Sequence, residues 1–521
     1  MSIHFVCLLF FVSCITSITG SSFAQEDVDF KIKEPFVVKS QNKEQVNSRL
    51  RDYFSDMPEL NYFGSQSIGA SASVFIYGLD QRYFDIKYNG HQLQDPTTPL
   101  GALEVSSLSR LSGMRVDRDV RAQSIDISND NQKSSVGAQV TTLKEISVDG
   151  FYAVTDKLFF KSGYSRLGGY NQTNIGREKD WTEEFFLAPT YINKIGDYEL
   201  ISDFLYTFKD QDYDSILSGS EGSKGSSSYL FLGQTVKSKK LNIKLSYTDI
   251  DKDFDEGFNF EPFETQATVL NSEVTYDKKI RLKTQFEKNN ELEDSKLILS
   301  YIRKCFKLSI LTSKIRGEFF SGDIKPIKEV TIFYKELEPS LFQLELSQNE
   351  SLSKQKALGL QFEKSYELTN KFDLRISFLY QRAFDQVEYD FITNTYQNFQ
   401  KVENGFLNLL TQWGNLGFYA QFQRAVNLET NEELPRRSPL SFGLDYEINF
   451  KGFSAEIEGA WHSSRKAFDQ TRLSDFFTTR LSAERNGFQI VVTNVLNQDT
   501  EIYRSFRRKP VTLELNYLYR F

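Results

Sequence analysis

The stretch Val511 to Phe521, VTLELNYLYRF, decides how the rest of the chain is interpreted. Side chains of an extended strand alternate between its two faces. One face is apolar and consists of Val511, Leu513, Leu515, Tyr517, Tyr519 and Phe521, while Thr512, Glu514, Asn516 and Arg520 lie on the other. A strand of a soluble β-sandwich would alternate in the same way. Aromatic residues at one end of the apolar face and a terminal Phe favour a strand of a membrane β-barrel.

The same alternation recurs from about residue 134 onward, in segments of roughly 10 residues that are divided by polar turns. It predicts about 22 strands, and an even number brings both ends of a single-chain barrel to the same side of the membrane. The predicted segments begin near Gly137, Ile146, Lys157, Glu183, Tyr198, Ser228, Leu241, Gln266, Lys279, Lys296, Lys307, Lys328, Ser340, Lys356, Phe372, Lys401, Trp413, Leu440, Gly452, Asp475, Gly487 and Val511. Charged residues on their inward faces fit a wet lumen better than a dry core.

Composition limits the alternatives. The chain has 521 residues, of which 14% are aromatic, and it has no apolar run near the roughly 20 residues of a membrane-spanning helix. Without such a helix, a chain crosses a membrane as a closed barrel, which leaves no backbone group unpaired in lipid. The net charge of -8 is spread over both signs without a basic block, so no nucleic-acid partner is expected.

Residues 1–24 are predicted to be a signal peptide, with an apolar run from Phe5 to Ile15 and small residues at Ser22 and Ala24. The alternative is a lipoprotein signal acylated at Cys14, which Phe11 fits poorly. Cleavage after residue 24 leaves Cys305 as the only cysteine. An internal disulfide is then impossible.

Residues 25–40 form a polar extended segment that either adds to the sheet edge of a partner or is a disordered terminus. Residues 41–132 are predicted to form a small mixed α/β domain, with a helix that begins after Asn42 and ends near Pro58. In the same domain Asn89-Gly90 predicts a tight hairpin turn. Residues 133–521 form the barrel. Since a barrel of about 22 strands is too wide to fill with its own side chains, the small domain is expected to plug it.

This order of parts, together with a series of short motifs, resembles the TonB-dependent outer-membrane receptor family, most closely its cobalamin transporter group. The motif positions are Glu34-Pro35-Phe36-Val37-Val38 for the box that TonB binds, Pro58-Glu59-Leu60, Phe75-Ile76-Tyr77-Gly78, Asp85 to Gly90, Leu434-Pro435-Arg436-Arg437, and Asn494 to Phe521. The resemblance covers nearly the whole mature chain. It implies an all-β fold, a transmembrane antiparallel barrel with a mixed plug, in the outer membrane of a Gram-negative bacterium.

The resemblance further implies a receptor that takes up a scarce ligand, such as a cobalamin-like or iron-siderophore compound, with energy from TonB. Its partners would be outer-membrane lipid, TonB and a small-molecule ligand, and the chain is expected to act as a monomer without a required cofactor. The plug departs from the family pattern, because Tyr77 replaces an Arg and Asp119 replaces a Gly. A second hypothesis is therefore a plugged barrel that has lost transport and serves as a surface-binding or structural protein.

The family pattern places ligand contacts at the plug apices, which here are Ser65, Gln66, Ser67, Gln92, Gln94 and Asp95. The alternative is that these are ordinary solvated loop residues. Asp210, Asp212 and Asp214 are predicted to lie in a barrel loop, where alternate carboxylates could hold calcium, although a solvated acidic turn gives the same pattern. An enzyme is not expected, since His91 and His462, the only histidines after signal removal, lie in no nucleophile or zinc motif.

Overall fold

The structure is a computed structural model. It describes residues 60–64, 72–76, 85–93, 95, 113–117, 124–128, 134–168, 181–213, 223–255, 263–277, 280–289, 295–303, 306–311, 314–321, 330–337, 352–353, 355–369, 372–390, 395–435, 437–467, 470–498, 501–503, 506–507 and 510–521. The signal peptide, the extended segment and the helix predicted after Asn42 lie outside these residues. No helix in the described part of the chain is long and apolar enough to cross a membrane.

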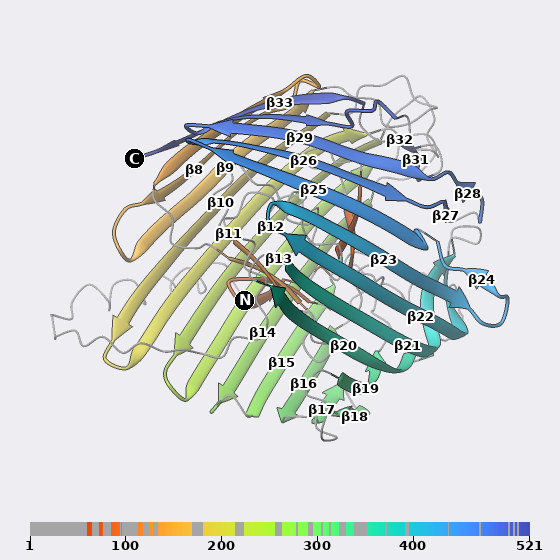
Figure 1. Cartoon of the computed structure of the whole chain (residues 1–521). Helices are drawn as coiled ribbons and strands as arrows, with labels where there is room; N and C mark the ends of the chain where they lie inside the picture. Colours follow the sequence, from red (N-terminus) through yellow and green to blue (C-terminus); the bar gives the residue numbers. More distant parts are fainter. Residues whose placement is uncertain are drawn as a thin grey trace.

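Most of the described residues form one closed antiparallel barrel (Figure 1). Its strands are β7 (Ser135–Thr141), β8 (Ile146–Ala153), β9 (Leu158–Gly168), β10 (Trp181–Ile195), β11 (Tyr198–Tyr213), β12 (Ser223–Lys237), β13 (Leu241–Asp255), β14 (Phe263–Tyr276), β15 (Ile280–Asn289), β16 (Ser295–Arg303), β17 (Phe306–Leu311), β18 (Lys314–Ser321), β19 (Val330–Leu337), β20 (Gln355–Thr369), β21 (Phe372–Asp390), β22 (Thr395–Trp413), β23 (Leu416–Asn427), β24 (Glu432–Glu433), β25 (Leu440–Phe450), β26 (Phe453–His462), β29 (Phe476–Arg485), β30 (Phe488–Thr493) and β33 (Thr512–Arg520).

The ring closes where the last strand meets the first. β33 pairs with β7, with Leu515 opposite Val140 and Tyr519 opposite Val136. Among the described residues, the ring has 22 strands of six or more residues, and the two-residue β24 lies in the connection between β23 and β25. The predicted barrel and its strand number are therefore confirmed.

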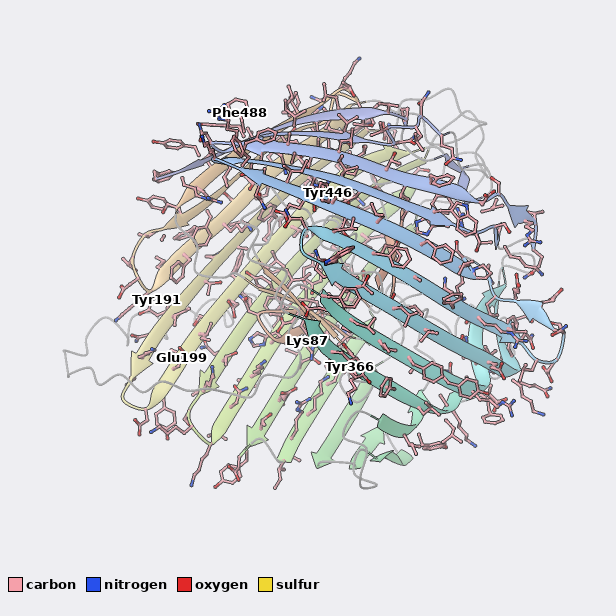
Figure 2. All side chains as sticks on the ribbon, in the orientation of Figure 1. Lys87, Tyr191, Glu199, Tyr366, Tyr446 and Phe488 are labelled. Atoms are coloured by element: carbon pink, nitrogen blue, oxygen red, sulfur yellow. The ribbon has the colours of Figure 1, made fainter. Side chains whose placement is uncertain are left out.

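The two faces of the wall follow the predicted alternation. In β33, Leu513 and Leu515 are 37% and 43% exposed, whereas Glu514 and Asn516 are buried on the inward face. The buried Glu514 accepts a hydrogen bond of 2.8 Å from Gln139 of β7, so polar side chains pair across the closing seam. Side chains project from both faces of the ribbon in Figure 2, and the labelled Tyr446 and Phe488 belong to the exposed apolar set.

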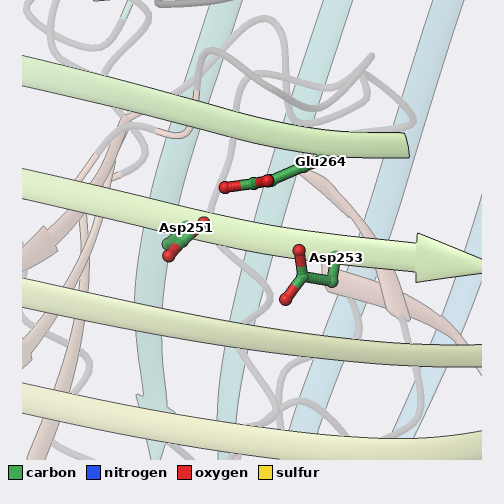
Figure 3. Close-up of side chains that lie close together, drawn as sticks. All are labelled: Asp251, Asp253 and Glu264. Atoms are coloured by element: carbon green, nitrogen blue, oxygen red, sulfur yellow. The ribbon is translucent and has the colours of Figure 1, made fainter. Parts of the chain in front are cut away.

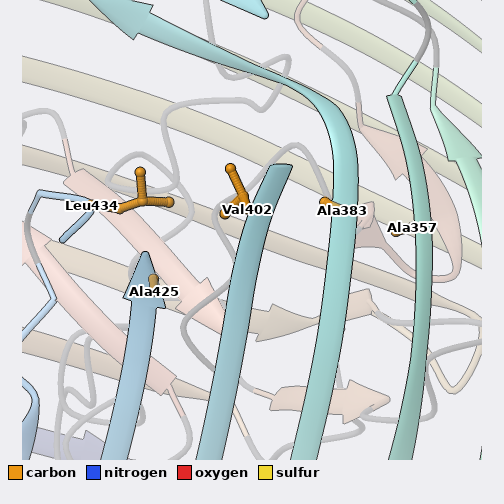
Figure 4. Close-up of a cluster of buried hydrophobic side chains, with 5 residues drawn as sticks. All are labelled: Ala357, Ala383, Val402, Ala425 and Leu434. Atoms are coloured by element: carbon orange, nitrogen blue, oxygen red, sulfur yellow. The ribbon is translucent and has the colours of Figure 1, made fainter. Parts of the chain in front are cut away.

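The barrel has two different ends. Tight turns with positive φ, at Gly196, Gly414, Lys451-Gly452 and Asn486-Gly487, connect strands at the end where Phe521 also lies, here called the turn end. Most connections at the opposite end, here called the loop end, are longer. Near the loop end, the chain after β24 turns back so that Leu434 packs against the strand residues Ala357, Ala383, Val402 and Ala425 (Figure 4).

The predicted plug domain contributes two small sheets. β1 (Leu60–Gly64) pairs with β2 (Ala72–Ile76). A four-stranded sheet has the order β4-β3-β6-β5 and consists of β3 (Asp85–Tyr88), β4 (His91–Leu93), β5 (Gly113–Asp117) and β6 (Ser124–Ser128). In Figure 1 these elements, coloured orange to brown, lie inside the ring. Two short hairpins, β27 (Arg465–Lys466) with β28 (Arg472–Leu473) and β31 (Glu501–Tyr503) with β32 (Phe506–Arg507), lie in connections between barrel strands.

Three strand predictions differ from the structure. β18 was not predicted, because Gly317 and the adjacent Phe319 and Phe320 interrupt the alternation, and the predicted segment near Ser340 lies outside the described residues. β12 begins at Ser223 and β22 at Thr395, each several residues before the predicted start. These early residues lie at the loop end. There the ladder continues beyond the apolar belt, and an outward apolar residue is no longer required.

Candidate functional site

The tip of the β3–β4 hairpin is the part of the described plug that meets the barrel most closely. The turn residues Asn89 and Gly90 have φ of 48° and 78°, and Tyr88 pairs with His91 across them. Asn-Gly is the preferred pair for such a two-residue turn. A Cβ at Gly90 would also collide with the side-chain nitrogen of Lys244. The positive φ of the turn favours glycine at this position, whereas Lys244 could move its flexible end to make room for a Cβ.

Four hydrogen bonds hold the tip, one of them from the backbone amide of Asn89 to the carbonyl oxygen of Ile127 at 2.8 Å. Asn89 Nδ2 donates to Asp203 Oδ1 of β11 at 2.7 Å, and Lys244 Nζ of β13 donates to the carbonyl oxygen of Gly90 at 2.8 Å. Within the plug sheet, the Gly90 amide donates to Asp126 Oδ1 at 2.8 Å. Asp203 also accepts from Thr190 Oγ1 of β10 at 2.9 Å. The tip is therefore fixed to the barrel by charge-assisted bonds, which are stronger than neutral ones.

His91 follows the turn and is fully enclosed, with a side-chain exposure of 1%. Its Nε2 shares a hydrogen bond of 3.0 Å with Thr235 Oγ1 of β12, and its ring packs edge-on against Phe231. Burial, with the positive charge of Lys244 second, lowers the pKa of His91 from 6.5 to about 3. The ring is therefore neutral at pH 7. Its 3.8 Å separation from Asp203 Oδ2 is not an ion pair in that state.

Two of the predicted ligand-binding residues lie against the same side of the barrel. Asp95 is buried and forms an ion pair with Lys252 of β13. Gln92 donates to Asp85 Oδ1 at 3.0 Å and accepts a hydrogen bond from Lys283 of β15. These contacts give Gln92 and Asp95 a part in holding the plug. Their contact with a ligand stays a prediction, and Ser65, Gln66, Ser67 and Gln94 lie outside the described residues.

The inward residues Asp203, Thr235, Lys244, Lys252 and Lys283 are called the clamp wall below. They come from β11, β12, β13 and β15, which are consecutive or nearly consecutive in the ring. Sequence reasoning identified the plug hairpin but none of these five partners. Each of them is one of many polar residues on an inward face, and no local signal distinguishes it.

A second set of inward residues has the opposite character. Ser377, Gln381, Asn404, Asn408 and Gln421, called the amide wall below, lie on β21, β22 and β23 and are each at most 4% exposed. They are close neighbours, because Ser377 pairs with Asn408, Asn408 with Gln421, and Gln381 with Asn404. Several of their polar atoms have no hydrogen-bond partner among the described residues. These atoms are the side-chain nitrogen and oxygen of Asn404, Asn408 and Gln421, the side-chain nitrogen of Gln381 and the hydroxyl of Ser377.

Two residues of the predicted calcium site do not lie in a loop. Asp210 and Asp212 lie in strand β11 rather than in a loop, and Asp212 accepts a hydrogen bond from the Trp181 indole; Asp214 lies outside the described residues. Within the described residues, one carboxylate group has ligand atoms close enough for a single ion, and it comprises Asp251, Asp253 and Glu264 at the loop end of β13 and β14 (Figure 3). Calcium binding at Asp210 and Asp212 stays a prediction.

Glu34, Pro35, Phe36, Val37 and Val38, the predicted TonB-binding residues, lie outside the described part of the chain. The same holds for Cys305.

Solved structures with this architecture include three that cover nearly the whole chain. The FrpB iron transporter from Neisseria meningitidis (F3-3 variant) has a TM-score of 0.65 at 10% identity, over 92% of this chain and 98% of its own. The siderophore receptor PirA from Acinetobacter baumannii has 0.64 at 10%, over 92% and 97%. A mutant of the ferric enterobactin receptor PfeA from Pseudomonas aeruginosa has 0.65 at 10%, over 91% and 96%.

The chain has the fold of these transporters and receptors, a closed β-barrel with a small domain inside it. No family model matches its sequence, and no curated protein is similar to it in sequence. The similar structures are transporters and receptors. At this level of identity they establish the architecture alone, and none of them singles out the cobalamin group.

Proposed function

We propose that the chain is an outer-membrane receptor that takes up a scarce solute into a Gram-negative cell with energy from TonB. The observation that supports this most is the plug hairpin held inside a closed ring by Asn89, Gly90, His91 and Asp95. A lumen of this width would be an open hole without its plug. The hairpin is held by a few polar contacts at its tip and flank, and such contacts can be broken and remade.

The outer surface supports the location. Exposed apolar residues such as Leu444, Tyr446 and Ile448 alternate along β25 and recur on most strands of the ring. Such a surface is costly in water and is stable in contact with lipid. The turn end, which carries Phe521, would face the periplasm, and the loop end would face the outside.

The class of solute is inferred from the solved structures that this chain resembles. The similar structures are an iron transporter, a siderophore receptor and a ferric enterobactin receptor. We infer a scarce ligand such as an iron-siderophore compound, with a cobalamin-like compound as the alternative that the motif series favours. The second function, a plugged barrel without transport, is favoured by Tyr77 and Asp119 in the plug motifs.

Uptake assays separate these functions. Cells that express the full chain are supplied with a radiolabelled ferric siderophore or radiolabelled cyanocobalamin, with and without TonB. We expect accumulation of one of these probes that requires TonB. Accumulation that continues unchanged without TonB would contradict the energy source, and surface binding without accumulation of either probe would support the second function.

The extended segment provides a finer test. Proline removes a backbone donor and fixes one dihedral, so Val37→Pro should disrupt strand pairing with TonB. We expect this variant to reach the outer membrane and bind the probe but to lose at least about 90% of TonB-dependent accumulation, because pairing is required for energy transfer. Asp27→Pro, outside the predicted box, is the matched control. Normal accumulation by Val37→Pro would show that Glu34 to Val38 is not a TonB box.

A further inference from the structure

The clamp wall and the amide wall face each other across the lumen. In the ring, β16 to β20 separate them on one side, and β25 to β10 separate them on the other. Figure 1 shows β21 to β23 on the near side and β11 to β15 on the far side. Whatever fills the lumen between them therefore meets two walls of different chemistry.

The polar groups of the clamp wall are paired with the plug. Separation there breaks the bonds of Asn89 to Asp203, of Lys244 to Gly90 and of Lys252 to Asp95. Each of these bonds includes a charged group, and a charge left unpaired in a buried site is costly. The clamp wall is thus the side of the lumen from which the plug separates least easily.

The amide wall has the opposite energetics. Its unpaired amide and hydroxyl groups are buried without partners among the described residues, which is an unfavourable state. Entry of water along this wall breaks no hydrogen bond of these groups and supplies the missing ones. Buried polar atoms without a partner also occur on β13 and β14, at Thr248 and Asn271, so the difference between the two sides is the set of charged bonds to the plug that opening at the clamp wall would break.

We propose that the passage opens along the amide wall while the β3–β4 hairpin stays attached to the clamp wall, and that the amide wall contacts a neutral solute rich in hydroxyl or amide groups. The solute part of this inference rests on the proposed uptake function, whereas the side on which the lumen opens does not depend on it.

The low charge of this wall supports the solute class, although the inward Arg375 lies one inward position before Ser377 on β21. The inward residues of three strand segments, Ser377 to Ala383, Val402 to Asn408 and Gln421 to Asn427, are all uncharged. Unpaired amides offer both donors and acceptors, which suit hydroxyl, carbonyl and amide groups. An anionic solute would find no cation on these segments, and a cationic solute would find no carboxylate.

The opening side is tested with a matched pair of cysteines in the full chain carrying Cys305→Ser. Ser377→Cys lies on the amide wall and Ser246→Cys on the inward face of β13, between Lys244 and Lys252. Both serines are buried, and both follow the first residue of their strand at the turn end by the same five positions. Labelling by a thiol reagent is followed in rising urea, and gel mobility without boiling confirms that the barrel stays folded.

We expect Ser377→Cys to reach half-labelling at a urea concentration lower by about 1 M than Ser246→Cys, given the usual cost of unpaired groups and the usual dependence of stability on urea. Coincident midpoints, or the reverse order, overturn the proposal. If Ser377→Cys does not fold, Asn408→Cys replaces it. Since this measurement needs neither TonB nor a solute, it holds or fails independently of the uptake function.

The neutral lining is tested by conductance. The full chain is studied in planar bilayers at the urea concentration that exposes Ser377→Cys and leaves Ser246→Cys protected. We expect a pore with little preference between potassium and chloride, and Asn408→Asp should raise the potassium-to-chloride permeability ratio on the order of threefold. Thr248→Asp, on the inward face of β13, should leave the ratio unchanged. Strong ion selectivity in the parent pore, or equal shifts in both variants, would overturn the assignment.

Discussion

The clamp wall and the amide wall belong to one barrel and have the same alternation of outward apolar and inward polar residues. They differ in whether the inward groups are bonded to the plug, although buried polar atoms without a hydrogen-bond partner also occur beside the clamp wall, at Thr248 and Asn271. Asp203, Lys244 and Lys252 each have a plug partner, whereas Asn404, Asn408 and Gln421 have none among the described residues. The pattern that makes a strand a barrel strand therefore leaves open what its inward face does. Inward polarity only makes a wet lumen possible, and pairing decides which side holds the plug.

The largest expected effect comes from removing the acceptor at the centre of the clamp. Asp203→Leu leaves the Asn89 amide and the Thr190 hydroxyl without their acceptor. Because the Asn89 bond joins the plug to the barrel and the Thr190 bond lies within the barrel wall, we expect attachment of the hairpin to weaken by about 2 to 3 kcal/mol, since a hydrogen bond to a charged group contributes about 1.5 to 3 kcal/mol. The urea midpoint for labelling of Ser246→Cys measures this. Asp203→Asn is the control and should lose less, because its amide oxygen still accepts both bonds. Equal midpoints for Asp203→Leu and the parent would contradict the clamp.

An intermediate effect is expected from acidification. The pKa of His91 is about 3 in the attached plug, and a released histidine has a pKa near 6.5. Below pH 6.5 the released state binds more protons, so attachment weakens as pH falls from 6.5 toward 3. The contribution of His91 alone to this loss at pH 5 is about 2 kcal/mol. The charged groups that face the imidazole of His91 are Lys244 of β13 and Asp203 of β11.

The two walls provide the control for this pH effect. The midpoint of Ser246→Cys should fall between pH 7 and pH 5, while that of Ser377→Cys should change little, which also corrects for the ionisation of the thiol itself. His91→Gln should remove the part of this difference that comes from His91. A pH response of equal size at both cysteines would show that His91 is not its source.

The sequence predicts the barrel well because a lipid boundary enforces alternation. Leu513 and Leu515 could be assigned to the outer face because every outward residue within the membrane has to be apolar. Where lipid ends, that constraint ends too. The Ser- and Gly-rich start of β12 and the polar start of β22 therefore look like loops although their ladders continue.

Only those features of the site that are set by neighbouring residues in the sequence can be predicted. Asn89-Gly90 specifies its own turn, so the hairpin could be identified from two residues. Its partners are 114 residues away at Asp203 and 154 away at Lys244, and the backbone ladder alone brings them together. The amide wall has no local signal of its own. Asn404, Phe406 and Asn408 form an inward row without charge, but so do Gln489, Val491 and Thr493 of β30.

The smallest expected effect is a stabilisation of the closed state, and it distinguishes the amide wall from the clamp wall most directly. Asn408→Leu removes an amide that is 0% exposed and unpaired among the described residues, and replaces it with an apolar side chain of similar size. We expect closure at the amide wall to strengthen by about 1 kcal/mol, since the cost of burying the unpaired group disappears. The urea midpoint for labelling of Ser377→Cys should rise, and that of Ser246→Cys should stay where it is.

The matched control is Thr235→Val, which also removes a buried polar group but one that is paired with His91 at 3.0 Å. It should weaken attachment at the clamp wall by about 1 kcal/mol, because His91 Nε2 then lacks its partner. The proposal requires that the two variants shift the urea midpoints of their walls in opposite directions. Each variant removes a buried polar group, and the two groups differ in whether they have a hydrogen-bond partner. If Asn408→Leu also weakens closure, the amides are satisfied in the closed state and the amide wall is not the side that opens.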